Sequence, residues 1–177
     1  MAQRRAPSSG SRHVRPSRPV MPIESVRERG SKSIIPVTCG SASVILGGIV
    51  AAVTGPTGWS DGSWVAAFLV LVMGVGQIGL GVGQAFVGPR PPTRRTVVIE
   101  STLWNLGSLT VIAGTLMAAP LLVSFGGLAL VIALTLLARV VRTANQHGEW
   151  LGRAYRSLVL VLLVSIPVGI ALAWVRS

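Results

Sequence analysis

The sequence has few of the residue types that most catalytic and metal-binding sites need. Its 177 residues include one cysteine, two histidines and five acidic residues. A single cysteine, Cys39, excludes an intramolecular disulfide and a zinc or iron–sulfur site built on several thiolates. His13 and His147 both lie outside the apolar segments, which excludes a bis-histidine haem within the membrane. We therefore expect no catalytic residue, no metal and no cofactor, and predict that the protein is not an enzyme.

Charge is also scarce, and its distribution excludes a soluble globular domain. Charged residues make up 12% of the chain, whereas an average domain has about 25%. No Asp, Glu, Lys or Arg occurs in four stretches, each of at least 19 residues: 33–60, 62–89, 101–138 and 157–175. Because about 20 apolar residues cross the hydrocarbon core of a bilayer, the pattern predicts an all-α integral membrane bundle.

A glycine motif in the second stretch raises one soluble alternative, a dinucleotide-binding unit. Gly74, Gly76 and Gly79 have the spacing G-x-G-x-x-G, and Glu100 follows Gly79 by 21 residues. However, residues 80–88 lack the charged face of a soluble helix, and no further strand–helix alternation follows to complete a parallel sheet. We therefore favour the membrane interpretation.

In a membrane helix the same glycines predict packing faces, because helices in lipid associate through small residues. One expected face holds Gly76, Gly79 and Gly83. An adjacent stripe holds Gly74, Gln77, Gly81 and Gln84. A smooth groove beside two amides is a suitable surface for another helix.

The apolar segments divide into five predicted spans. Residues 97–141 would form a helix of about 67 Å at about 1.5 Å per residue, which is over twice the core thickness of about 30 Å. Pro120 interrupts the helix there, so we divide this segment in two. The predicted spans are 37–54, 64–87, 98–116, 121–141 and 157–175. The first could instead be a cleaved signal peptide ending at "AAVTG", but a long leader precedes it and favours an uncleaved span.

Basic residues predict the orientation of these spans. Residues 1–33 are expected to be a disordered cationic cytoplasmic tail, and 34–177 the transmembrane domain. With the N-terminus inside, 15 of the 16 Lys and Arg residues lie on the cytoplasmic side, and only Arg176 lies outside. The tail suits anionic lipid headgroups. No aromatic residues interleave its arginines, so we expect no nucleic-acid partner.

Polar residues within the spans are the candidate functional positions, because they are costly in a bilayer. Gln77, Gln84 and Asn105 are expected to make interhelical hydrogen bonds, with a polar solute pathway as the alternative. Glu100 is expected at the cytoplasmic interface, beside Arg94 or Arg95, with a proton-carrying role as its alternative. The tryptophans fall near predicted span ends, as interfacial anchors do. They are Trp59, Trp64, Trp104, Trp150 and Trp174.

Two stretches, 61–77 and 103–116, resemble those of small polytopic membrane proteins of high-GC Gram-positive bacteria. The shared features are a Gly-Ser-Trp start at Gly62 and a Trp-Asn-x-Gly start at Trp104. The resemblance implies a multi-pass protein of the bacterial plasma membrane, and it implies no activity and no catalytic residues.

Two functions are consistent with this pattern. The first is a non-enzymatic subunit or helper of a larger membrane assembly, as a homo- or hetero-oligomer in the lipid bilayer. Small-residue faces, scarce intramembrane charge and short loops favour it. The alternative is a small oligomeric transporter or channel whose path is lined by Gln77, Gln84 and Asn105. An odd number of spans without a visible internal repeat disfavours the usual transporter plan.

Overall fold

The computed structural model describes residues 23–87, 92–142 and 149–175, and these residues form helices and short turns without a strand. In chain order the elements are α1 (Ile23–Thr57), α2 (Gly62–Phe68), the π-helix η1 (Leu69–Gly76), α3 (Gln77–Val87), α4 (Arg94–Leu116), α5 (Pro120–Arg142) and α6 (Glu149–Val175). α2, η1 and α3 follow one another without a break and act as a single span.

Five helical segments in the described part of the chain are long and apolar enough to cross a membrane. They are Ser33–Thr57, Gly62–Ala85, Arg94–Leu116, Pro120–Arg139 and Gly152–Val175. Each overlaps one of the five predicted spans. The prediction of an all-α bundle with five membrane-spanning helices is therefore confirmed.

The turn between α4 and α5 shows why residues 97–141 do not form one helix. Ala118 adopts a left-handed conformation, with φ of 50°. The Ala119 amide donates to the Gly114 carbonyl at 2.8 Å, and the Ala118 amide donates to the Thr115 carbonyl at 3.2 Å. This pair of bonds is a Schellman motif, which closes a helix C-terminus. Pro120 then begins α5, where its missing amide proton is not needed.

The first helix is longer than the predicted first span. α1 begins at Ile23, so the part of the predicted tail from Ile23 onward is helical; residues 1–22 lie outside the described residues. Pro36, expected near a helix start, is instead inside α1. Its ring lies against Gly81 of α3, where any side chain would collide with it.

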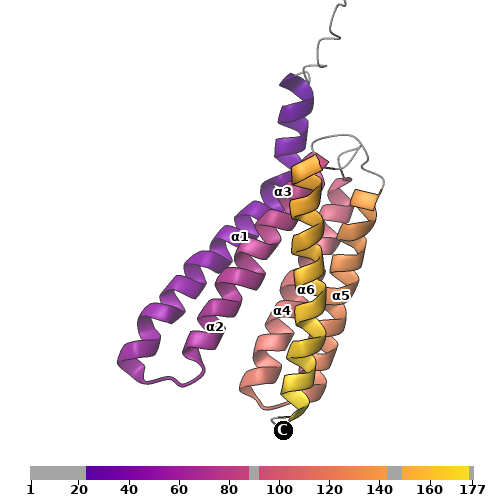
Figure 1. The fold of residues 1–177 in the computed structure, drawn as a ribbon. Helices are drawn as coiled ribbons and strands as arrows, with labels where there is room; N and C mark the ends of the chain where they lie inside the picture. Colours follow the sequence, from indigo (N-terminus) through magenta and orange to yellow (C-terminus); the bar gives the residue numbers. More distant parts are fainter. Residues whose placement is uncertain (1–22, 88–91, 143–148, 176–177) are drawn as a thin grey trace, which may run out of the picture.

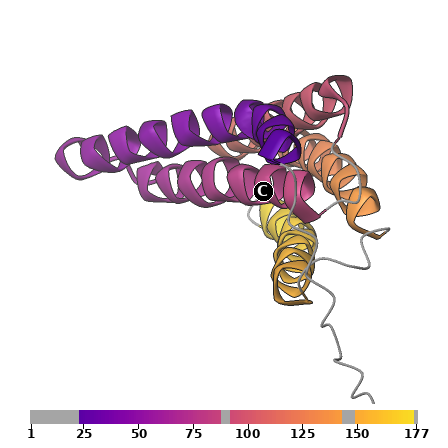
Figure 2. The ribbon, with the colours of Figure 1, turned by 90° about the horizontal axis from the view of Figure 1, so that it is seen from above.

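The spans form two groups that diverge at one end (Figure 1). α1 lies beside the α2–η1–α3 span, and both point away from α5 and α6 when seen from above (Figure 2). The two helices approach closely where a Cβ built on Gly40 would lie 2.8 Å from the Gly74 carbonyl oxygen. α4 and α5 form the second hairpin, with a Cβ on Gly126 only 2.6 Å from the Gly107 oxygen. Small residues therefore set both helix pairings, as is typical in lipid.

α6 joins the two groups. The Tyr155 hydroxyl donates to the Leu137 carbonyl at 3.3 Å, and the Trp174 indole donates to the Ser124 hydroxyl at 3.2 Å. Both acceptors belong to α5, so these bonds attach the two ends of α6 to it. Tyr155 also belongs to the main core cluster, together with Leu80, Trp104, Leu134 and others. Trp104 is fully buried there, so its prediction as an interfacial anchor is wrong.

Candidate functional site

The polar side chains of the second and third spans meet in the interior of the bundle. Gln77 and Gln84 of α3 and Glu100 of α4 are each at most 3% exposed. The Gln84 amide donates to one Glu100 carboxylate oxygen at 2.8 Å. A hydrogen bond to a carboxylate is among the stronger kinds, so this contact links the two helices at a buried position.

Several polar atoms of this region have no hydrogen-bond partner among the described residues. They are both amide atoms of Gln77, Oε1 of Glu100, Nε1 of Trp104 and Oγ of Ser108. Three of these residues, Gln77, Glu100 and Trp104, line a void of about 20 Å³. A site of about 10–15 Å³ with several polar neighbours can hold one water. We call four polar residues that line this void, Gln77, Gln84, Glu100 and Trp104, the buried polar cluster.

The hydrogen-bond partner of Glu100 differs from the sequence-based expectation. It was expected at the interface, neutralised by Arg94 or Arg95. Both arginines are exposed, and the hydrogen-bond partner of Glu100 in the described part of the chain is Gln84. Glu100 lies on the face of α4 that packs toward α3, where Gln84 offers a donor. Glu100 therefore lies between helices of the bundle, and its location at the cytoplasmic interface stays a prediction.

Asn105 lies outside the cluster. Its side chain is half-buried, and its amide donates to the Ser101 carbonyl one turn earlier in α4, at 2.7 Å. This bond lies within one helix, where an interhelical one was expected, and it uses one of the two N–H donors of the amide.

The second-span glycines pack against helices of the same chain. Gly79 lies against Leu158 of α6, and Gly83 lies against the Tyr155 ring, while Gly76 faces Trp104 of α4 and Leu162 of α6. In the adjacent stripe, Gly74 and Gly81 face α1, whereas Gln77 and Gln84 belong to the buried polar cluster. The stripe was predicted as one surface, but its glycines contact α1 and its glutamines line the void beside α4.

The π-helix η1 was not predicted. Its eight residues, Leu69–Gly76, immediately precede Gln77. π-Helices are rare and usually occupy a single turn, often at functional sites. No sequence signal distinguishes this run from an ordinary apolar helix, because its only unusual feature is the pair Gly74 and Gly76.

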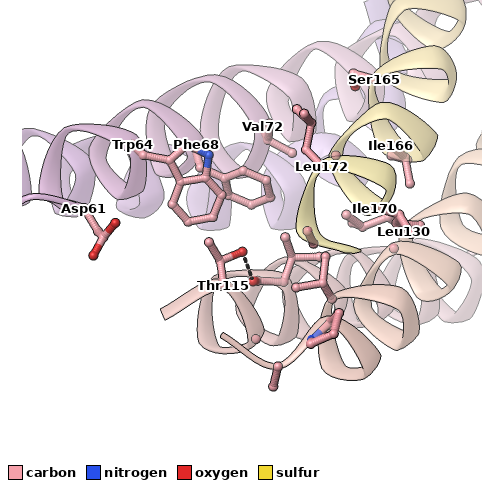
Figure 3. A pocket seen from close by; sticks show the side chains of 18 of the residues that line it. Asp61, Trp64, Phe68, Val72, Thr115, Leu130, Ser165, Ile166, Ile170 and Leu172 are labelled. Atoms are coloured by element: carbon pink, nitrogen blue, oxygen red, sulfur yellow. Dashed lines mark hydrogen bonds between the residues drawn. The ribbon is translucent and has the colours of Figure 1, made fainter. Parts of the chain in front are cut away.

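A larger cavity opens on the other side of Trp104. It has a volume of about 420 Å³ and lies where the two helix groups diverge, between α2–η1 and the facing parts of α4, α5 and α6 (Figure 3). Trp104 lines both this cavity and the small polar void. No feature of the sequence predicts this cavity, because its walls come from four separate spans.

The chemistry available to these sites is limited to hydrogen bonding, apolar contact and one carboxylate in each, Glu100 in the small void and Asp61 in the large cavity. In the described ranges no group of three or more His, Cys, Asp or Glu could hold a metal ion. Cys39 is a free, half-buried thiol. In comparisons with known proteins, no family model, no curated protein and no solved structure matches this chain.

Proposed function

We propose that the chain is a multi-pass protein of a bacterial plasma membrane, with its N-terminus in the cytoplasm and its C-terminus outside. The start of α1, the end of α3, the start of α4, the end of α5 and the start of α6 lie at one end of the bundle (Figure 1). In the sequence, 15 of the 16 basic residues lie near these helix ends or in the segments joined to them. The positive-inside rule therefore supports a cytoplasmic location for that end.

Reporter fusions test this orientation. An alkaline phosphatase fused after Ser177 is expected to be active, and one inserted in the 143–148 connection is expected to be inactive. A fluorescent protein that matures only in the cytosol should give the reverse pattern. Cytosolic fluorescence of the fusion after Ser177 would contradict the proposed topology.

Within that membrane we propose a non-enzymatic role as a subunit or helper of a larger assembly. The observation that supports it is a stripe of small residues on α1 that faces away from the other described helices. Ser41, Gly48, Ala52 and Gly55 are all exposed and recur at i, i+7, i+11 and i+14. A Cβ built on Gly48 or Gly55 would meet no atom of the described residues within 4 Å.

This stripe supports association with another helix. In a bilayer the hydrophobic effect does not bring apolar helices together, so association depends on close packing. Small residues allow two helix backbones to approach closely and gain packing contacts. The second-span glycines cannot serve this purpose, since α6 and α1 of the same chain already cover them. The α1 stripe also consists of small residues, and it is exposed on the surface of the bundle.

The corresponding experiment replaces Gly48 and Gly55 by leucine. Because both positions are open, the double variant should fold as the wild type does and should lose its partners. Gly152→Leu is the matched control, since Gly152 of α6 is equally open. The mass of the complex in a mild detergent is measured, with its components identified by mass spectrometry. A wild-type monomer of 18.4 kDa or a homo-oligomer alone would contradict the helper role.

The buried polar cluster supports a second candidate, a small transporter or channel. Buried polar groups within a span are typical of substrate and ion pathways. Protein in liposomes should then conduct protons, read by an internal pH dye, and Gln77→Leu with Gln84→Leu should abolish the flux. If flux is absent from the wild type, or unchanged in the variant, the cluster only stabilises the bundle.

A further inference from the structure

The large cavity has the size of a small-molecule site. Its volume of about 420 Å³ falls within the range of about 300–1,000 Å³ that is typical of ligand pockets. Side chains of the second span form one wall, and those of α4, α5 and α6 form the others (Figure 3). These elements are far apart in sequence, so the cavity is a product of the tertiary fold.

The interior of the cavity is apolar. Val72, Leu130, Ile166 and Ile170 contribute to it. The two wall hydroxyls are already hydrogen-bonded within their own helices, Thr115 to the Val111 carbonyl at 2.9 Å and Ser165 to the Leu162 carbonyl at 2.9 Å. An occupant therefore gains dispersion contacts from most of the surface and needs an apolar body.

The edge of the cavity has a different chemistry. Among the described residues that line the cavity, Asp61 is the only charged one. Trp64 and Phe68 follow at i+3 and i+7, which places all three on one side of the second span. The rings of Trp64 and Phe68 form a tilted pair with centroids 5.4 Å apart. In the described part of the chain, the Asp61 carboxylate has one hydrogen bond, from the Ser60 hydroxyl at 3.4 Å.

We propose that this cavity binds a lipophilic organic cation, a molecule with a bulky apolar body and a single positive charge. The apolar walls take the body. Asp61 attracts the charge, and the faces of Trp64 and Phe68 stabilise it through cation–π contact. A neutral acyl chain would fill the same walls but would leave the anionic and aromatic edge without a role. The site is separate from the proposed assembly surface on α1.

The test compares two probes of equal shape and opposite charge, tetraphenylphosphonium and tetraphenylborate. Equilibrium dialysis measures their binding to the full chain in lipid nanodiscs, with empty nanodiscs as the blank. We expect saturable binding of the phosphonium ion and at least tenfold weaker binding of the borate. Asp61→Asn should reduce the affinity for the cation about tenfold. The control Thr57→Ala, at an exposed position of the same loop end that does not line the cavity, should change it little.

A second variant tests the location independently of charge. Gly169 lines the cavity, and a Cβ there would meet no atom within 4 Å, so Gly169→Phe should fill the space without disturbing the fold. It should abolish cation binding, while Gly152→Phe, at an open position outside the cavity, should not. Binding equal to empty nanodiscs, equal affinity for both probes, full affinity in Asp61→Asn or full affinity in Gly169→Phe would each overturn the proposal.

Discussion

The aromatic ring of Tyr155 in α6 lies directly on Gly83 of α3, in the space that any side chain at position 83 would occupy. The same tyrosine donates a hydrogen bond to the Leu137 carbonyl of α5. One residue thus joins three helices. Gly83→Ala should force the ring away and reduce the free energy of unfolding by about 1–3 kcal/mol, the usual cost of overpacking. Unfolding in mixed micelles with increasing denaturing detergent measures this change.

Gly79→Ala is the matched control for that variant. A Cβ at position 79 would lie 3.1 Å from a terminal methyl group of Leu158. This methyl can rotate aside, so we expect a much smaller loss of stability. Equal losses for the two variants would show that the Tyr155 contact is not the critical one.

Neighbouring glycines of α5 should also differ in their tolerance of alanine. At Gly126 the added carbon would lie 2.6 Å from the Gly107 carbonyl oxygen and 2.8 Å from the Val111 amide, which are backbone atoms that cannot move separately. At Gly127 the closest atom, at 2.7 Å, is the flexible end of Ile170. Gly126→Ala should therefore cost about 1–3 kcal/mol. The same unfolding assay should find Gly127→Ala closer to the wild type, and the reverse order would contradict the described α4–α5 pairing.

The Gln84–Glu100 hydrogen bond can be measured by a double-mutant cycle with Gln84→Leu and Glu100→Leu. Hydrogen bonds between membrane helices contribute about 0.6–2 kcal/mol, and we expect a coupling energy in that range. Glu100→Gln should retain the bond, because its amide oxygen can accept from Gln84. A coupling energy near zero would mean that the two side chains do not interact in the folded protein.

The α4–α5 turn offers a stabilising substitution. A left-handed conformation costs an alanine about 1–2 kcal/mol, and Ala118 occupies the position of the Schellman motif where glycine is preferred. Allowing for the greater flexibility of glycine when unfolded, Ala118→Gly should raise stability by about 0.5–1 kcal/mol. Ala119→Gly has no strain to relieve and serves as the control. A loss of stability in Ala118→Gly would contradict the described turn.

The five spans could be predicted because they depend on a local property of the chain. An uncharged stretch of sufficient length enters the hydrocarbon whatever its neighbours are. The division at Pro120 was predictable for a similar reason, since a proline affects only its own turn of helix. Helix α1 extended beyond its prediction because its first turns carry charge and lie outside the apolar window.

The interior of the bundle could not be predicted in the same way. The depth of Glu100 along α4 suggested the interface, and its burial depends on Gln84, a residue of another span. The position of Trp104 in the sequence indicated only that it lies near a span end. Its side chain is buried because it packs with Leu80, Leu134 and their neighbours, which belong to other spans. The glycine motif indicated smooth faces, while the shapes of Tyr155 and Pro36 determined which helix covers each one.

The divergence of the two helix groups has a mechanical consequence. The second span, Gly62–Ala85, has 24 residues and is about 36 Å long at about 1.5 Å per residue. Along its whole length this span packs on α1, whereas its contacts with α5 and α6 lie mainly at its α3 end. The α1–second-span pair is thus attached to the rest of the bundle mainly at that end. A rotation of the pair by about 5° about the attached end would move the Trp64 end by about 3 Å, which would widen or close the gap at the far end by about the diameter of a water molecule.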